Sequence, residues 1–444
     1  VLRREMRQFE GAWTSDNAIE AGKVRLERLG YFKEVNVETI PVPGTDDQID
    51  ISYSVEEETT GSIGGNIGYS DFGLMLGFNL QEQNFLGSGN TVGIGINKNV
   101  YSEMYNISYM NPYATRDGVS LGYNLYFRET DYGEFNVANY LTNSSGFGAQ
   151  FGYPISDITR LGFNITYDKT DIDIGSLPAR EIYDFVSVEG NIFETLSAQL
   201  SWQRVTLNRG LFPTDGASTV LSVSSTIPGS DLSYYRLNVR QRYYQPLTQN
   251  LVFGFQGELG YLDAYGDTEE TPFFQNFYAG GPRSLRGFES NTLGPRSTDA
   301  PCYEFNYAEG TCPNLLDTDG DGELDTPYYN PYANQTSRYR DAPIGGNIKI
   351  EGSLQLIFRL PFIEDQRSLR SAFFFDFGNV FSDNCKDYQI NCSEPSVDDL
   401  RYSYGVGLTW ITGFGPMSLA IAKPTNAGPR ERTEEFQFTV GNVF

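Results

Sequence analysis

Apolar side chains recur at every second residue in many segments of this 444-residue chain, and no other feature restricts its fold as strongly. One segment carries Leu74, Leu76, Phe78 and Leu80. This alternation gives a strand one apolar face and one polar face. No apolar run approaches the ~18 residues that a membrane-spanning helix needs. The pattern therefore predicts a mainly β fold.

The length and number of these segments favour a transmembrane β-barrel. Segments of about ten residues that are apolar on one face and aromatic at their ends are typical of such barrels. The sheet must close on itself, because lipid cannot satisfy the backbone groups of an open edge. We count about 16 segments, an even number as expected for a single-chain antiparallel barrel. A soluble β-sandwich shows similar alternation and is the alternative fold.

The first 59 residues predict a small α/β domain instead. Leu2, Met6 and Phe9 fall on one face of a first helix, and a second helix begins near the cap residues 14–17. Gly30 occupies a helix C-cap position, and two alternating strands follow it. Because Val1 already lies within the first predicted helix, we expect that residues of this domain precede the sequence.

The predicted organisation is therefore a domain at 1–59 and a barrel at 60–444. A long extracellular loop is expected at about 265–345, where polar and turn-forming residues accumulate. We also predict a short helix in an outer loop near 181–190.

Composition excludes several classes of function. The formal net charge is −25, whereas nucleic-acid binding needs a basic surface, so no nucleic-acid partner is predicted. The chain contains no histidine, which removes His-dependent triads and imidazole metal sites and argues against a barrel hydrolase.

The four cysteines form two close pairs in polar loops, Cys302 with Cys312 and Cys385 with Cys392. Close pairs in such loops predict disulfide bonds formed in an oxidising compartment. We place both on the outer side of the barrel.

Acidic side chains alternate between residues 317 and 325. Asp317, Asp319 and Asp321 occupy the first, third and fifth positions of a calcium-binding loop, and Asp325 could donate at the ninth. The twelfth position is Tyr328 instead of the usual Glu. Residues 317–325 could form either a weak Ca²⁺ site or a solvated acidic loop. No other cofactor is predicted.

A glycine-rich stretch at 280–288 opens the longest polar region of the chain and carries the cations Arg283 and Arg286. Loops longer than about 15 residues are usually functional or disordered. The stretch predicts either a specific, cation-bearing loop or a disordered outer loop that happens to contain Arg-Gly-Phe.

Five motifs are more specific, and they lie at 208–216, 226–230, 277–281, 285–288 and 436–441. Together they resemble the BamA family, the central subunits of the outer-membrane β-barrel assembly machinery. The resemblance covers nearly the whole chain, and residues 1–59 resemble a POTRA domain that lacks its first strand. The family's loop motif usually begins with Val, where this chain has Leu285.

The resemblance implies a protein that folds and inserts nascent barrels into the outer membrane of a Gram-negative bacterium, with its POTRA domain in the periplasm. The implied partners are nascent outer-membrane proteins, lipoprotein subunits and outer-membrane lipid, with no nucleotide and no enzymatic activity. The alternative is a two-partner-type secretion pore of the same superfamily. A passive porin would give no reason for a POTRA-like domain.

The resemblance also places the loop motif inside the barrel and pairs its arginine with inward carboxylates on two strands. The motif consists of Leu285, Arg286, Gly287 and Phe288. If the phenylalanines at 373 and 375 face lipid, Asp376 faces the lumen. By the same parity Gln355 and Glu351 face the lumen on the other strand, although Gln355 cannot neutralise a charge.

Finally, the resemblance implies a lateral gate between the first and last strands, at about 63–70 and 435–444. Glycines give the first strand little to pack, and a glycine near the end of the last strand weakens pairing and lets it turn inward. The predicted gate residues are Ile63, Gly64, Gly65, Ile67 and Gly68 on the first strand and Phe438, Val440, Gly441 and Phe444 on the last.

Overall fold

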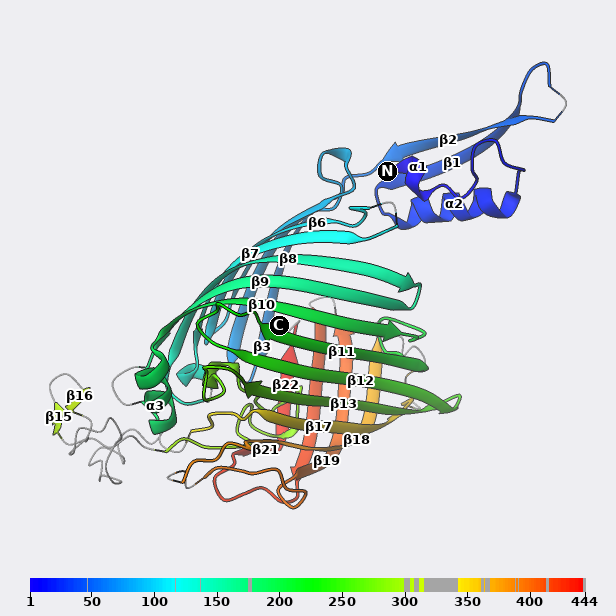
Figure 1. Ribbon diagram of the computed structural model, residues 1–444. Coiled ribbons are helices and arrows are strands. Elements are labelled where there is room, and N and C mark those ends of the chain that lie inside the picture. Colours follow the sequence, from blue (N-terminus) through cyan, green and yellow to red (C-terminus); the bar gives the residue numbers. More distant parts are fainter. Residues whose placement is uncertain are drawn as a thin grey trace.

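The computed structural model describes residues 1–45, 47–115, 117–135, 137–174, 178–298, 304–306, 311–314, 342–360, 363, 368–387, 389, 391–412 and 415–441. Within them, sixteen antiparallel strands close into one barrel, and a small α/β domain stands at one end of it (Figure 1). The predicted mainly β fold and its strand number are therefore confirmed. None of the described helices is long and apolar enough to cross a membrane.

The N-terminal domain contains α1 (Leu2–Glu5), α2 (Asp16–Arg28), β1 (Phe32–Pro41) and β2 (Ile49–Glu57). Ser15 caps α2, because its side chain accepts a hydrogen bond from the Ala18 amide. Leu26 on the inner face of α2 is fully buried. The prediction for Phe9 was wrong: α1 ends at Glu5, where Met6 becomes extended, and the Phe9 side chain is 74% exposed.

The barrel strands follow one another around the wall, and each pairs with the next along the chain. The first eight are β3 (Gly61–Ser70), β4 (Gly73–Glu82), β5 (Thr91–Lys98), β6 (Ser102–Asn111), β7 (Ser120–Asp131), β8 (Leu141–Ser156), β9 (Thr159–Asp173) and β10 (Ile192–Val205). The others are β11 (Gly216–Thr226), β12 (Tyr234–Thr248), β13 (Leu251–Ala264), β17 (Ile348–Phe358), β18 (Leu369–Phe381), β19 (Arg401–Thr412), β20 (Gly415–Pro424) and β22 (Phe436–Val440).

The apolar positions of these strands point away from the lumen. Leu74 and Phe373 are about half exposed on the outer surface, whereas Asp376 on the opposite face of β18 is fully buried. This arrangement suits a wall with lipid outside and polar groups inside. The alternation seen in the sequence thus fixes which side chains can reach the lumen.

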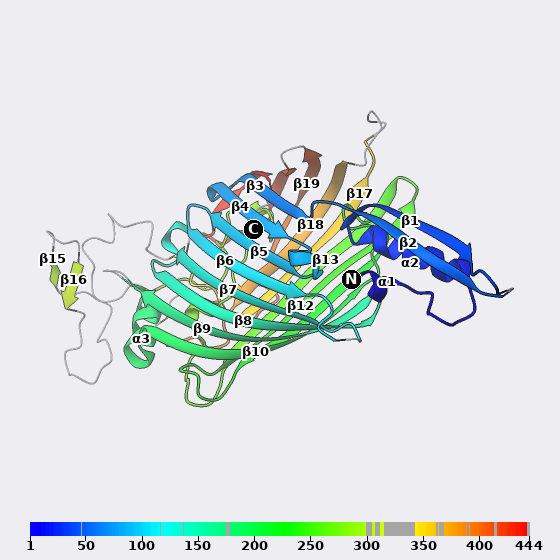
Figure 2. The same cartoon turned by 90° about the horizontal axis from the view of Figure 1, so that it is seen from above.

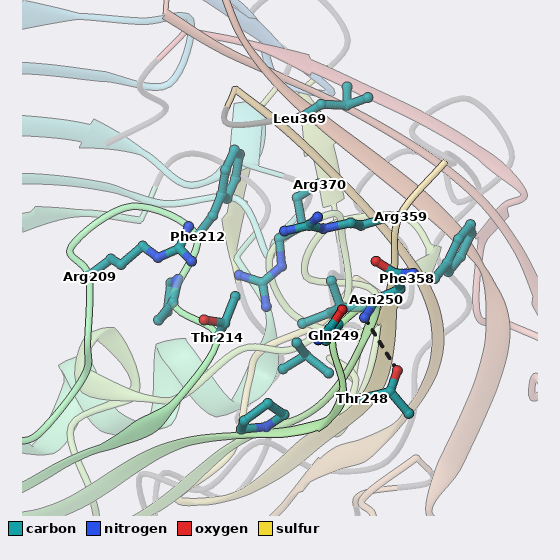
Figure 3. Close-up of a pocket in the computed structure, with 14 residues that line it drawn as sticks. Arg209, Phe212, Thr214, Thr248, Gln249, Asn250, Phe358, Arg359, Leu369 and Arg370 are labelled. Carbon is teal, nitrogen blue, oxygen red and sulfur yellow. Dashed lines mark hydrogen bonds between the residues drawn. The ribbon is translucent and has the colours of Figure 1, made fainter. Parts of the chain in front are cut away.

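The two ends of the barrel differ. Short turns lie at the end that carries the N-terminal domain, and the connections after β10, β12 and β17 surround a pocket of about 570 Å³ there (Figure 3). The opposite end carries the long loops and the predicted outer helix, α3 (Arg180–Glu189) (Figure 2). Two small sheets lie in the loops, β14 (Gly287–Phe288) with β21 (Thr433–Glu434), and β15 (Glu304–Asn306) with β16 (Thr311–Asn314).

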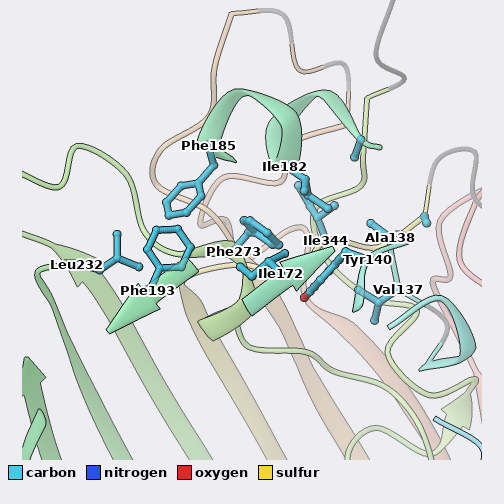
Figure 4. Packing of buried hydrophobic residues seen from close by; sticks show 12 residues of the cluster. Val137, Ala138, Tyr140, Ile172, Ile182, Phe185, Phe193, Leu232, Phe273 and Ile344 are labelled. Atoms are coloured by element: carbon cyan, nitrogen blue, oxygen red, sulfur yellow. The ribbon is translucent and has the colours of Figure 1, made fainter. Parts of the chain in front are cut away.

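The outer loops pack around an apolar cluster of their own (Figure 4). Phe273 lies at its centre, edge-on to Tyr140 at 4.8 Å and to Phe185 of α3 at 5.4 Å between ring centroids. Ile182 and Phe193 are almost completely buried in the same cluster. We call this assembly of loops the outer cap.

Candidate functional site

The barrel closes between its last strand, β22, and its first, β3, and this seam is sparsely paired. In the described residues, which end at Gly441, β22 forms five register pairs with β20 but a single one with β3, between Val440 and Tyr69. β3 pairs with β4 along its whole length from Gly61 to Ser70. Within the described residues, most of the β3 edge that faces the seam therefore has no strand partner.

Gly441 ends this pairing and lies against β3. Its φ is +81°, and a Cβ added to it would lie 2.6 Å from the Ile67 carbonyl oxygen. Its amide donates a hydrogen bond to the Pro416 carbonyl at 2.8 Å. Glycine suits this position because only it combines positive φ with such close backbone contact. Phe444 and the course of residues 442–444 lie outside the described residues.

The other predicted gate residues add little packing between the two strands. The Ile63 and Ile67 side chains are 75% and 65% exposed, and Gly64, Gly65 and Gly68 have no side chain to contribute. On β22, Phe438 lies opposite Leu419 of β20, and Val440 lies opposite Met417 of β20. β22 is therefore held mainly from its β20 side.

The loop motif contacts the inner face of β18 through Arg286. Its Nε and Nη2 donate to the two carboxylate oxygens of Asp376, both at 2.7 Å, and its main-chain amide donates to the same carboxylate at 3.2 Å. The guanidinium also lies 3.4 Å from the centroid of the Phe374 ring. Asp376 is fully buried, so this bidentate ion pair is shielded from water and strongly directional.

Ser353 on β17, which the sequence reasoning missed, supplies the next acceptor. Arg286 Nη2 donates to Ser353 Oγ at 3.0 Å, and Gln355 Nε2 donates to the same oxygen at 3.3 Å. Gln355 thus approaches the arginine through a shared hydroxyl. Parity could have identified Ser353, because it lies on the same face of β17 as Gln355 and Glu351.

Glu351 holds a different part of the loop. It forms an ion pair with Lys349 at 2.9 Å and accepts a hydrogen bond from the Ser284 hydroxyl. Lys349 also approaches Glu258 of β13 at 3.6 Å. Arg283, the other cation of the stretch, is exposed. Asp376 therefore binds Arg286 of the loop, whereas Glu351 binds Ser284.

Leu285 and Phe288 fix the motif in an apolar cluster with Leu262, Phe277 and Val380. Leu285 is 1% exposed and Phe288 is fully buried. A loop with these side chains buried is ordered, so the reading of a disordered stretch does not apply to 280–288.

The same motif contacts the last strand through Gln437 of β22, a residue that sequence reasoning also missed. Its side-chain amide donates to the Phe288 carbonyl at 2.8 Å, and its oxygen accepts from the Gly287 amide at 3.3 Å. Gln437 is 2% exposed. A Cβ on Gly287 would lie 3.2 Å from the Ala422 side chain of β20, so the loop lies directly against this part of the wall.

The loop also contacts the other side of the seam. The Ser290 hydroxyl donates a hydrogen bond to Asp71, which lies in the turn between β3 and β4. The segment 286–290 thus bonds to β18, β22 and the first hairpin of the barrel. It bridges the sparsely paired seam from inside.

The outer cap is tied together by polar and covalent links. Cys385 and Cys392 form a disulfide bond, as predicted. The Thr298 amide donates to both oxygens of Glu181 on α3 at 3.0 Å. Burial is the main influence on Glu181 and raises the pKa of its carboxyl group.

Two predicted sites cannot be placed. The Cys302–Cys312 pair and the acidic residues Asp317, Asp319, Asp321 and Asp325 lie outside the residues whose side chains are described. Elsewhere in the described chain, no group of three or more Cys, Asp or Glu side chains is placed to hold a metal ion.

Two family models match this chain and show the superfamily to which it belongs. Residues 84–444 match the Omp85 superfamily domain, and residues 1–58 match a POTRA model described as a surface antigen variable number repeat. The chain belongs to the Omp85 superfamily. This membership agrees with the barrel, the N-terminal domain and the loop motif described above.

Omp85 relatives are similar over the whole chain. The outer membrane protein assembly factor BamA of Neisseria meningitidis is 29% identical over all of this chain and 54% of its own length. The chain spans about half the length of the curated relatives that it matches end to end. A crystal structure of BamA from Haemophilus ducreyi lacking POTRA domains 1–3 is 30% identical, with a TM-score of 0.81, over 99% of this chain and 80% of that one.

A more distant structure shares the fold alone. CdiB from Escherichia coli has a TM-score of 0.58 and 12% identity over 99% of this chain and 73% of that one. The Neisseria relative and the Haemophilus structure therefore give the more specific comparison, and both are BamA proteins.

Proposed function

We propose that this chain is the membrane-embedded part of an outer-membrane protein assembly factor, with residues 1–59 as its periplasmic domain and 60–444 as its barrel. It folds and inserts nascent β-barrel proteins through a lateral gate between β3 and β22. The observation that carries this proposal is the seam, which has one register pair within the described residues, whereas every other junction of the barrel has at least five.

The seam provides both an opening and a template. Each backbone hydrogen bond contributes about 1 kcal/mol net, so a junction with few of them separates more easily than its neighbours. Once open, the β3 edge presents unpaired amides and carbonyls, which bind another strand by β-augmentation. An exposed edge is normally an aggregation hazard, and here it serves as the working surface.

The luminal loop would keep the closed seam in register. Arg286 anchors the loop to β18, while Gln437 and Ser290 connect it to the two sides of the seam. Opening must break the contacts of Gln437 or Ser290 but leaves the ion pair intact. This role for the loop motif requires no covalent chemistry, in agreement with assembly as the function.

The proposed partners are nascent outer-membrane proteins, the lipoprotein subunits of an assembly complex and outer-membrane lipid. The names of the relatives support the assembly role and the membrane location. The outward apolar side chains of the barrel suit the same location.

A two-partner-type secretion pore is the second candidate, since it would share the superfamily fold. Assembly is preferred because relatives named as assembly factors match this chain from end to end. Secretion requires a path through the lumen, whereas assembly requires a path through the wall. The two functions therefore differ in their need for the seam.

The test is a disulfide across the seam, made with Tyr69→Cys and Val440→Cys in the protein that carries this chain. These residues form a register pair, and opposed residues of an antiparallel pair lie within disulfide reach. We expect the oxidised protein to stop inserting a client barrel into proteoliposomes and to recover on reduction.

The matched control is Leu80→Cys with Ile94→Cys, a register pair between β4 and β5. Its crosslink should leave insertion unchanged. If the seam crosslink also leaves insertion unchanged, the gate mechanism is wrong. Continued passage of a secreted protein through the crosslinked barrel would favour the secretion pore.

A further inference from the structure

Three arginines converge on the pocket at the domain-bearing end of the barrel (Figure 3). Arg209 comes from the β10–β11 connection, Arg359 follows β17, and Arg370 lies at the start of β18. The space that they line is about 570 Å³, enough for a polar headgroup. We call it the arginine pocket.

Arg209 and Arg359 are exposed and Arg370 is half-buried, and none of the three has an acidic partner in the part of the chain that the structure describes. Nη2 of Arg370 is buried without any hydrogen-bond partner, and its guanidinium lies 4.8 Å from the centroid of the Tyr244 ring. A buried cation without an acceptor is costly unless a ligand supplies one.

The pocket is lined by residues from both faces of the wall. Arg370 shares the inward face of β18 with Phe374 and Asp376, whereas Leu369 shares the outward face with Phe373. Phe358 lines the pocket and stacks on Phe373, with 4.8 Å between ring centroids. The lining therefore combines three cations with Phe358 and Leu369, whose strand positions share the apolar, outward face.

We propose that the arginine pocket binds a phosphate group. Guanidinium groups bind phosphate in a bidentate manner, and three of them can satisfy several of its oxygens. A phospholipid headgroup is the source that the apolar lining favours, because acyl chains can continue along Phe358 and Phe373. Free phosphate presents the same chemistry without that apolar contact.

The test is a lipid titration followed by native mass spectrometry, on protein purified in a detergent without phosphate. The probes are phosphatidylglycerol, diacylglycerol with the same acyl chains, and inorganic phosphate. We expect phosphatidylglycerol to bind and diacylglycerol to bind at least about tenfold more weakly, since it lacks the charged acceptor. Phosphate that competes with the lipid identifies the headgroup as the bound part.

The variants are Arg209→Gln and Arg370→Gln, alone and together, with circular dichroism to confirm folding. The double variant should lose about tenfold or more in phosphatidylglycerol affinity. The control, Arg204→Gln, removes an arginine near the end of β10 that is exposed like Arg209 but does not line the pocket, and it should change affinity less than about twofold. Gln keeps hydrogen-bonding capacity, so a loss reports the charge.

Two outcomes would overturn the proposal. Equal binding of phosphatidylglycerol to the wild type and the double variant would mean that the arginines do not hold the lipid. Failure of the wild type to bind either phosphatidylglycerol or inorganic phosphate would mean that the pocket is not a phosphate site. Binding of phosphate without the lipid would keep the phosphate site and reject the headgroup as its source.

Discussion

The wall formed by β13, β17 and β18 and the seam formed by β22 and β3 belong to one barrel but are joined very differently. Both junctions of the wall run through the whole of β17, from Ile348 to Phe358. The seam has one register pair among the residues described up to Gly441. Because ladder bonds contribute about 1 kcal/mol each, the barrel is expected to open at the seam while the wall stays intact.

One luminal loop contacts both regions, with different chemistry at each. It binds the wall through a shielded, bidentate ion pair between Arg286 and Asp376. It binds β22 through two neutral hydrogen bonds of Gln437. Charge-assisted bonds are roughly twice as strong as neutral ones, so the loop has a fixed anchor and a releasable contact.

The largest effect is expected from Arg286→Glu, which destroys the anchor. The new carboxylate would face the fully buried Asp376, and breaking a buried ion pair typically costs about 3–5 kcal/mol. We expect the loop to leave the wall and client insertion to fail. Limited proteolysis of the 280–298 segment and an insertion assay measure the two effects.

Arg283→Glu is the matched control, because it makes the same charge change at an exposed residue of the same loop. It should leave both the protease resistance and insertion close to wild type. Equal behaviour of the two variants would remove the special role of Arg286.

The next effect is expected from Gly441→Val, which changes the seam alone. A β-branched residue is strained at φ +81°, and its Cβ would collide with the Ile67 carbonyl. We expect a cost of about 1–3 kcal/mol and a lower crosslinking yield for the Tyr69→Cys and Val440→Cys pair.

Gly229→Val is the control that separates the backbone strain of a positive φ from the collision of the added Cβ with β3. Gly229 has a similar positive φ of +98°, but a Cβ there would meet nothing within 4 Å. The control should lower stability without changing the seam crosslink. A normal crosslinking yield in Gly441→Val would show that this glycine does not position β22 against β3.

The alternating pattern predicted most of the barrel because a period of two specifies both strand and face. It predicted the inward position of Asp376 without any knowledge of the loop's path. It could not predict Phe9 correctly, because helical spacing does not show where a short helix ends; here the chain becomes extended at Met6.

The partners of the loop were only partly predictable. Parity gives every inward residue of β17 equal weight, and only the path of the loop selects Ser353 over Gln355 as the acceptor for Arg286. Gln437 lies on the inward face of β22, but its contact with Phe288 joins residues far apart in the sequence. Such contacts depend on tertiary packing, which no local pattern contains.

A smaller effect is expected from Gln437→Leu, which removes the releasable contact. The Phe288 carbonyl and the Gly287 amide would lose their partner in a buried site, at a cost of about 1–3 kcal/mol. Hydrogen exchange should become faster in β22, while the loop stays on the wall through Arg286.

Gln355→Leu is the control for this variant, because it removes a luminal glutamine on β17 that donates one long bond to Ser353. It should leave exchange in β22 unchanged. If Gln437→Leu also leaves β22 unchanged, the loop does not restrain the seam.

The smallest effect concerns the outer cap, and it tests whether pH acts on a region separate from the seam. Burial raises the pKa of Glu181 in the folded protein, so the neutral carboxyl is favoured there. Its stabilising contribution is therefore present below the ordinary glutamate pKa and is lost as pH rises through the raised value.

Glu181→Gln should abolish this dependence while keeping an acceptor for the Thr298 amide. The measurement is the protection of that amide at pH 5 and pH 8, after correction for intrinsic exchange. We expect protection to fall with pH in the wild type and not in the variant, while the Gly441 amide at the seam behaves alike in both. The same decrease in the variant would mean that another group controls the cap, and a change at Gly441 would mean that cap and seam are coupled.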